Sequence, residues 1–357
     1  MPETDISLHT GRVLYVSGSE IWMSKRQRLF VSHDGGLSCN PHAKLPLTCA
    51  REWLTALPYG TRLGRVGFHH FIKTSASSAI IIAHRGIFAL DIGQKRLKQV
   101  ARLHGSRPLS LCIHEDRLYY GEYRSNPERS PVHVWSSNIN GQDWQPIWQF
   151  NHIRHVHGVY HDPYTSSMWV TTGDEDSESA IWCTDDQFKS LRKVAGGSQM
   201  QRTIKLLFTK THIYFGSDAP EKQNYIWRMK RADLQLERLC AVGGSVFSGT
   251  IIGEHLFFAT AVEPSTTNRS RFVELWTSPN GESWAISKKY RKDMLPMKYF
   301  QYGQIFFPNG PGDDNHLWYT PFSTQNNEHT FRITLPHDNS TNLQAALSFA
   351  HSPTIDA

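Results

Sequence analysis

The densest group of chemically active side chains lies between Asn151 and Asp162, in the segment NHIRHVHGVYHD. Side chains alternate along a strand, so His155 and His157 are expected to share one face of it. The acidic run that contains Asp174 follows shortly after and is expected to reach the same place. An imidazole beside a carboxylate can act as a general base or acid near neutral pH. His157 and Asp174 are therefore predicted catalytic residues.

Two other interpretations of the histidine pair stay open. Two histidines on one face plus a carboxylate can hold a divalent metal, which makes His155 and His157 the metal-ligand candidates. A His-x-His pair on a strand is also typical of a hydrogen-bonded lining. The residues by themselves require no cofactor, and a divalent metal is the alternative.

Arginines and acids recur around the predicted strands. Guanidinium groups that converge from several segments form a fork-like cradle for a carboxylate or a sulfate. The predicted substrate-binding residues are Arg65, Arg107, Arg154, Arg202, Glu122, Arg124 and Asp218. The alternative is that each arginine pairs with a neighbouring acid and only ties segments together.

The segment KYFQY at 298–302 is expected to begin another strand, with Tyr299 and Tyr302 on opposite sides. A tyrosine paired with a carboxylate can act as the nucleophile on an anionic sugar, where a charged nucleophile would be repelled. Glu263 is the expected partner, so Glu263 and Tyr302 are predicted catalytic residues and Tyr299 a substrate-binding one. A packing role for the tyrosines is the alternative.

The elements that must position these residues repeat along the chain. An aromatic residue follows an aliphatic one in seven short apolar runs, at Trp22, Phe88, Trp135, Trp182, Trp227, Trp276 and Trp318. A period of about 40–50 residues built from short strands is typical of a β-propeller. We predict an all-β chain of seven blades with four antiparallel strands each, these aromatics lying on the third strands. Six blades are the alternative.

One domain is expected over residues 1–357. The approximate blades are 10–48, 63–103, 108–150, 155–197, 202–242, 246–290 and 297–335. The long interval between Trp22 and Phe88 is expected to contain a crossing segment with a helical turn around Arg51 to Leu57. The inner strand missing from the first blade could be residues 5–11, DISLHTG. The tail at 336–357 could instead close the ring.

Composition narrows the partners. The net charge of +6 and the 19 histidines favour an anionic partner, and the short basic clusters disfavour nucleic acid. No apolar run has membrane-spanning length, so no membrane is expected. The five scattered cysteines suit reduced thiols, and the start has no signal-peptide pattern. A cytoplasmic location is expected, with non-classical export as the alternative, and the sequence does not indicate an oligomeric state.

Three segments share a turn motif: Ser32-His-Asp-Gly-Gly-Leu-Ser-Cys39, Ser137-Asn-Ile-Asn-Gly-Gln-Asp-Trp144 and Ser278-Pro-Asn-Gly-Glu-Ser-Trp284. Asp/Asn-Gly suits the hairpin between two outer strands. The first segment resembles the Asp-box, Ser-x-Asp-x-Gly-x-Thr-Trp, and the chain therefore resembles the BNR (sialidase-like) β-propellers. In that superfamily Asp-boxes are structural and lie away from the reactive centre. The Phe/Tyr-Arg-Ile-Pro motif of sialidases is absent.

The resemblance implies carbohydrate chemistry. Together with the arginines, it predicts a carbohydrate-active enzyme, a glycoside hydrolase or a polysaccharide lyase. Its expected partner is an acidic oligo- or polysaccharide bound at the mouth of the propeller channel. The alternative is a non-catalytic propeller scaffold that binds a glycan or a protein at the same face.

Overall fold

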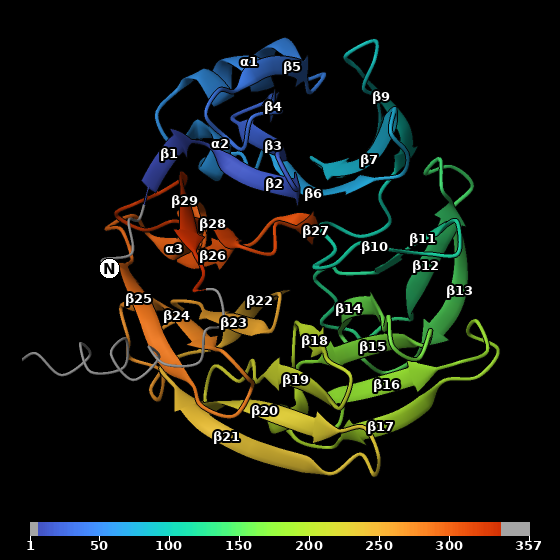
Figure 1. Cartoon of the computed structure of the whole chain (residues 1–357). Helices are drawn as coiled ribbons and strands as arrows, with labels where there is room; N and C mark the ends of the chain where they lie inside the picture. Colours follow the sequence, from blue (N-terminus) through green and yellow to red (C-terminus); the bar gives the residue numbers. More distant parts are fainter. Residues whose placement is uncertain (1–5, 337–357) are drawn as a thin grey trace, which may run out of the picture.

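The computed structural model describes residues 6–336. Over this range the chain forms seven small sheets that stand round a central axis (Figure 1). The predicted seven-bladed β-propeller with four antiparallel strands per blade is confirmed, and the six-bladed alternative is wrong. One further short strand, β27 (Asn309–Gly312), runs parallel to the innermost strand of the first blade.

The first four blades follow one another along the chain. Blade one consists of β2 (Arg12–Ser17), β3 (Glu20–Lys25), β4 (Arg28–Ser32) and β5 (Asn40–Lys44). Blade two consists of β6 (Phe68–Lys73), β7 (Ser78–Ala83), β8 (Gly86–Asp91) and β9 (Arg96–Arg102). Blade three consists of β10 (Cys112–His114), β11 (Arg117–Gly121), β12 (Val132–Asn138) and β13 (Gln145–Phe150). Blade four consists of β14 (His155–His161), β15 (Met168–Gly173), β16 (Ala180–Thr184) and β17 (Arg192–Gly196).

The last three blades complete the ring. Blade five consists of β18 (Leu206–Phe208), β19 (His212–Gly216), β20 (Asn224–Lys230) and β21 (Leu236–Val242). Blade six consists of β22 (Val246–Ile252), β23 (His255–Thr260), β24 (Phe272–Ser278) and β25 (Ala285–Arg291). Blade seven consists of β26 (Gln304–Phe306), β28 (His316–Phe322), β29 (His329–Thr334) and β1 (Ile6–Thr10).

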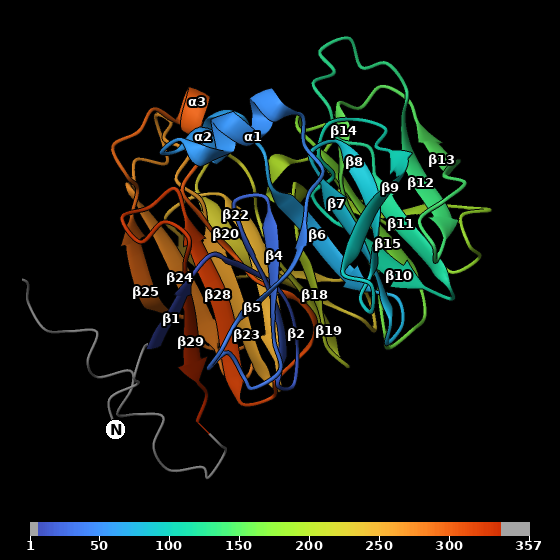
Figure 2. The same ribbon diagram turned by 90° about the horizontal axis from the view of Figure 1, so that it is seen from above.

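Short helices cover one end of the ring. They are α1 (Cys49–Ala56), α2 (Gly60–Leu63) and α3 (Met297–Phe300), which lie together in Figure 2, and a 3-10 turn at Gln199–Gln201 precedes blade five. The helical turn predicted around Arg51 is thus confirmed as α1. None of the helices described is long and apolar enough to cross a membrane.

The strand β7, the second strand of blade two, shows why a strand between two blade cores is apolar on both faces. Side chains alternate along a strand. Ala79 and Ile81 pack into the core shared with blade one, whereas Ile80 and Ile82 pack into the core shared with blade three. All four are buried, and fully burying an isoleucine contributes about 1.5–3 kcal/mol. One strand therefore holds two neighbouring blades against its own.

A register shift marks the same place in the outer hairpin of every blade. It falls beside an aromatic residue of the third strand, and these residues are Phe30, Phe88, Trp135, Trp182, Trp227, Trp276 and Phe331. The prediction that Trp22 and Trp318 also lie on third strands is wrong, because both lie on second strands. Second and third strands have the same alternating apolar pattern, which does not distinguish them.

The N-terminal strand closes the ring. β1 pairs antiparallel with β29, with Ile6 opposite Arg332 and Thr10 opposite His329, and forms the outer edge of blade seven. The expectation that residues 5–11 supply the inner strand of blade one is wrong, because β2 occupies that place. The alternative of closure by the tail at 336–357 falls outside the described residues, apart from residue 336.

The three turn motifs lie in hairpins between third and fourth strands, in blades one, three and six. In blade one, Asp34 accepts hydrogen bonds from the hydroxyls of Ser32 (2.7 Å) and Ser38 (2.6 Å). The amide of Gly36 donates to Ser32 Oγ at 2.8 Å. These bonds close the turn and lower the pKa of Asp34.

Blade four contains a fourth hairpin with the same bonds. Asp186 accepts from the hydroxyls of Thr184 (2.7 Å) and Ser190 (2.6 Å), and the amide of Phe188 donates to Thr184 Oγ1 at 3.2 Å. Phe188 takes the place of the turn glycine and has a φ of 66°. A bulky residue is rare in that conformation, which is why the motif was missed in the sequence.

Candidate functional site

Asp174 lies at the centre of a cluster of charged side chains. It follows β15, at the end of the ring where the loop into blade five also arrives. Its carboxylate has four partners: Arg154 Nη1 (3.0 Å), Arg202 Nη2 (3.1 Å), His155 Nε2 (3.2 Å) and His157 Nε2 (3.4 Å). Burial would raise the pKa of Asp174, but the histidine hydrogen bonds and the charge of Arg202 lower it far below its ordinary value.

A bulge in β14 aims both histidines at the same carboxylate oxygen. The register between β14 and β15 slips at His157, and such a bulge redirects a side chain. His155 and His157 therefore both face Oδ1 of Asp174. Gly173 permits this approach, since an added Cβ would lie 2.6 Å from Cε1 of His157.

The other nitrogen of each ring faces a backbone carbonyl. Nδ1 of His157 lies 3.2 Å from the oxygen of Thr203, and Nδ1 of His155 lies 3.4 Å from that of Arg124. A carbonyl only accepts hydrogen bonds, so Nδ1 carries the proton in each ring. A ring that also carries a proton on Nε2 donates it to Asp174, which is the hydrogen bond that lowers the pKa of that carboxyl. When the ring is neutral with its proton on Nδ1, the Nε2 lone pair faces the same oxygen and is free to bind a cation. Burial lowers the pKa of His157, which disfavours the doubly protonated ring.

A cation between these atoms would satisfy all three. The Nε2 atoms of His155 and His157 and Oδ1 of Asp174 lie within 4.8 Å of one another. Donors that bind one ion at about 2.0–2.2 Å are about 3–3.5 Å apart, as the distances to Asp174 are. Two imidazoles and a carboxylate suit Mn²⁺, Fe²⁺ or Zn²⁺, and Nδ1–H bonded to a carbonyl is the usual outer support of a ligating histidine.

A buried carboxylate that the sequence analysis missed fixes the backbone of the cluster. Glu178 Oε2 accepts from the amides of Arg154 (3.1 Å) and Asp174 (3.0 Å), while Oε1 accepts from Nε of Arg129 (2.7 Å). Burial would raise the pKa of Glu178, but these bonds lower it, so it stays ionised. It positions both partners without touching the histidines.

Two further carboxylates border the cluster. Asp218 accepts from Nε of Arg202 at 3.1 Å and is 2% exposed, yet its Oδ1 has no hydrogen-bond partner among the described residues. Glu263 Oε2 is likewise buried without a partner. Burial and the charge of Asp218 raise the pKa of Glu263 to about 7. Tyr302 is hydrogen-bonded to Glu263, and burial and that carboxyl raise its pKa.

The segment 298–302 does not begin a strand, so that prediction is wrong. A turn of helix, α3, starts after Pro296 and ends at Phe300, and the chain then reverses at Gln301, which has a φ of 69°. Tyr299 lies on α3 with 54% of its surface exposed and makes no contact with the Asp174 cluster. Only Tyr302, in the following loop, reaches a carboxylate.

The side chains of Glu122 and Arg124 pair with each other, and only the backbone carbonyl of Arg124 faces the cluster, at His155. Arg124 Nε lies 2.8 Å from Glu122 Oε1. Glu122 Oε2 also accepts from Nδ1 of His133 (3.1 Å) and Nε1 of Trp135 (3.3 Å). This pair therefore has the geometry of the alternative interpretation, in which an arginine pairs with a neighbouring acid.

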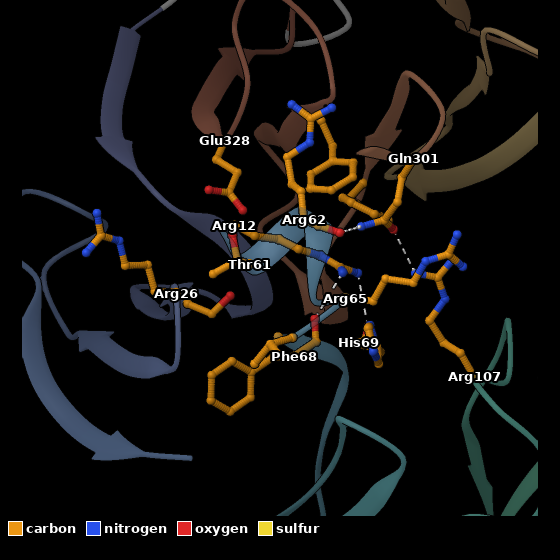
Figure 3. A pocket seen from close by; sticks show the side chains of 15 residues that line it. Arg12, Arg26, Thr61, Arg62, Arg65, Phe68, His69, Arg107, Gln301 and Glu328 are labelled. Carbon is orange, nitrogen blue, oxygen red and sulfur yellow. Dashed lines mark hydrogen bonds between the residues drawn. The ribbon is translucent and has the colours of Figure 1, made fainter. Parts of the chain in front are cut away.

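Arg65 and Arg107 line a separate pocket (Figure 3). Arg12, which the sequence analysis did not single out, lies there too. Nη1 of Arg107 donates to Oε1 of Gln301 at 3.2 Å. The ring of Tyr123, another missed residue, packs at a tilt against His155 with centroids 4.1 Å apart. Burial lowers the pKa of Arg107, and the nearby Tyr123 hydroxyl partly opposes that lowering. The pocket and the Asp174 cluster are therefore neighbours.

No protein-family model and no curated protein matches this chain. Solved structures do match. An oligogalacturonate lyase in complex with manganese is 10% identical, covers 92% of this chain and 91% of its own, and has a TM-score of 0.56. A chain of the mitotic checkpoint complex is 12% identical over 94% and 91%, with a TM-score of 0.54. The extracellular domain of the hybrid two component system BT4673 from B. thetaiotaomicron is 11% identical over 94% of this chain and 40% of that one, with a TM-score of 0.59. At these identities the similarity shows the β-propeller fold alone.

Proposed function

We propose that the protein is a metal-dependent carbohydrate-active enzyme that cleaves a uronate-containing glycan by β-elimination. The supporting observation is the cluster of His155, His157 and Asp174, which brings one potential ligand atom from each residue within 4.8 Å of the others. The chain shares its fold with an oligogalacturonate lyase in complex with manganese, and the activity named for that protein is what suggests elimination here.

The charges of the site suit an acidic sugar. A divalent cation at the histidines would neutralise a uronate carboxylate and acidify the C–H bond beside it. Arg107 and Arg65 lie in the neighbouring pocket without a carboxylate partner among the described residues, and guanidinium groups bind planar carboxylates well. A neutral sugar would leave these charges uncompensated.

Glu263 and Tyr302 are the proposed proton carriers. With a pKa of about 7, Glu263 is partly ionised near neutral pH and can take the proton beside the carboxylate. The C–H electron pair forms the C4=C5 double bond as the C4–O bond breaks. Tyr302 stays protonated because its pKa is raised, and donates to the leaving oxygen. The hydrogen bond between the two side chains lets Glu263 return its proton to Tyr302.

The hairpin network supports the sialidase-like relationship as part of the same proposal. Asp34 and Asp186 accept the same pair of hydroxyl bonds in two blades. Both hairpins join third to fourth strands, at the opposite end of those strands from the loops that carry Asp174. The repeated turn therefore suits a stabilising role in the proposed family and no role in chemistry.

The test separates elimination from hydrolysis. Protein stripped with a chelator and reloaded with Mn²⁺ is incubated with polygalacturonate, and the ultraviolet absorbance of the new double bond is followed together with reducing ends. We expect both signals to rise with Mn²⁺ and neither to rise without it. His157→Ala should lower Mn²⁺ affinity at least about tenfold.

The matched control is His161→Ala, at the far end of β14, where the ring stacks on His114 with centroids 4.1 Å apart. It should bind Mn²⁺ like the wild type. Reducing ends without absorbance would indicate a glycoside hydrolase. Neither signal on polygalacturonate, with glycan still bound, would favour the non-catalytic scaffold.

A further inference from the structure

A second group of arginines lines a pocket on the blade-one side of the channel mouth (Figure 3). The pocket is formed where β2, the loop after α2, the loop into blade three and the loop after α3 meet. Its basic residues include Arg12, Arg65 and Arg107, and Glu328 is the one carboxylate among its lining residues. Whether these cations already have anionic partners decides whether the pocket can take an anionic ligand.

Arg12 is held rigidly. Its Nη1 donates to the carbonyl of Phe68 at 3.1 Å and its Nη2 to that of His69 at 3.0 Å. The guanidinium lies over the ring of Phe306, 3.5 Å from its centroid. Nε of Arg12 is buried and has no hydrogen-bond partner among the described residues. A guanidinium fixed in this way, with a donor left over, is prepared for a ligand.

Within the part of the chain that the structure describes, Glu328 is the one carboxylate of the pocket, and its charge acts on Arg12 without forming an ion pair at contact distance. Arg62, deeper in the pocket, forms an ion pair with Asp293 at 2.6 Å. Arg12, Arg65 and Arg107 form no such pair. Burial and mutual repulsion lower the pKa of Arg12, to about 9, and of Arg107. Arg12 and Arg107 are partly buried and Arg65 is exposed, so the pocket brings three guanidinium groups together where a ligand can reach them. Such a group of like charges favours an anionic ligand.

The pairing of the arginines in this pocket differs from that in the neighbouring Asp174 cluster. There, Arg154 and Arg202 both pair with Asp174 at 3.0 and 3.1 Å. The mouth is thus acidic and histidine-rich on one side and arginine-rich on the other. Tyr123 joins the two sides, since its ring packs at a tilt against His155 and lies near Arg107.

We infer that the pocket of Arg12, Arg65 and Arg107 is an anion subsite that takes the carboxylate of a second uronate unit. The inference rests on the proposed function, because the first unit is the one placed at His155 and His157. The substrate class is then an oligouronate with at least two acid groups, and a single uronic acid fills only one side of the mouth.

Calorimetric titration of the Mn²⁺-loaded protein with digalacturonate and with galacturonate tests this. We expect the wild type to bind the dimer at least about tenfold more tightly, the effect of one charged hydrogen-bonded pair. Arg107→Gln and Arg65→Gln should each remove most of that preference and leave galacturonate affinity unchanged. The control is Arg96→Gln, an exposed arginine on β9 of the outer edge of blade two, which should behave like the wild type.

Thermal unfolding checks that the variants are folded; Arg65 is exposed, so its variant is expected to fold normally. Equal affinity for dimer and monomer in the wild type, or variants that weaken both sugars alike, would overturn the subsite. Inorganic sulfate that competes with the dimer at equal concentration would show a general anion pocket and overturn the uronate assignment. Dimer preference without Mn²⁺ binding or product would refute the proposed function and not the subsite. Elimination without a preference for the dimer would refute the subsite and not the proposed function.

Discussion

Nδ1 of His157 lies 3.2 Å from the carbonyl oxygen of Thr203, which belongs to the loop that leads into the next blade. This bond fixes the proton of a blade-four histidine through the backbone of blade five. The Nε2 atom that faces Asp174 is therefore set by how two blades pack, and not by one strand alone. Changes that move either blade edge should therefore displace the atoms proposed to bind the metal.

Gly173→Ala should disturb His157 directly. The new methyl group would lie 2.6 Å from Cε1 of His157 and 3.1 Å from Cγ of Arg202, so the imidazole must move. We expect a loss of about 1–3 kcal/mol in the free energy of unfolding, and loss of Mn²⁺ binding. Chemical denaturation and calorimetry measure the two effects. Gly93→Ala, where the nearest atom is 3.6 Å away, is the control, and equal behaviour of both variants would contradict the prediction.

Glu178→Gln should weaken the support of the cluster. Glutamine keeps the shape but removes the charge that accepts from Arg129 and the two backbone amides. We expect about 1.5–3 kcal/mol of lost stability, the range for hydrogen bonds to a charged group. Glu175→Gln is the control, because Glu175 is 62% exposed and lies 3.9 Å from the same arginine. A Glu178 variant as stable as this control in urea denaturation would argue against the role.

Arg231→Ala should destabilise the fold without affecting Mn²⁺ binding. Asp162 is fully buried at the far end of β14, and both its oxygens accept from Arg231, with Nη2 at 2.9 Å from Oδ1. Removing one partner of a buried pair costs about 3–5 kcal/mol, because the other charge stays buried. The double variant Arg231→Ala/Asp162→Ala should recover part of the loss. If the double variant loses as much free energy of unfolding as the two single variants together, the two residues act independently and the prediction is wrong.

Glu263→Gln should change how stability depends on pH. The pKa of Glu263 rises from its ordinary 4.5 to about 7 in the folded protein. Between these values the folded state holds a proton that the unfolded state has lost, so the stability from this group is lost as pH rises. Relative to the glutamine variant, the wild type should lose on the order of 1–3 kcal/mol between pH 4 and 8. A difference that is constant across this range would contradict the raised pKa.

The aromatic period predicts the propeller because every blade must repeat the same contacts, yet it misplaces the positions in blades one and seven. Trp22 and Trp318 are aromatic residues of second strands, and the equivalent third-strand residues are Phe30 and Phe331. Bulge positions depend on backbone pairing between strands, which apolar alternation does not encode.

In the candidate site too, local patterns could be predicted from the sequence, whereas features that depend on contacts between segments could not. Alternation along a strand predicts that His155 and His157 lie together, and they do, but the bulge at His157 that brings both to one oxygen depends on pairing with β15 and could not be predicted. Arg12 stands at the start of β2, as Arg65 and Arg107 stand before inner strands. It was missed because the sequence left the inner strand of blade one open between residues 5–11 and the C-terminal tail. Glu178 was missed because its partners are backbone amides, which no residue pattern marks.

The closure by β1 sets the order in which a newly synthesised chain can finish folding. Thr330 donates to the carbonyl of Gly11 across 319 residues, so this contact joins two segments that are synthesised far apart in time. Six blades take their four main strands from neighbouring sequence, and each can form as it emerges. The seventh has to capture a strand made hundreds of residues earlier, a slow non-local step. Until then β29 presents an open edge, and a chain that stalls there carries a site for intermolecular strand pairing.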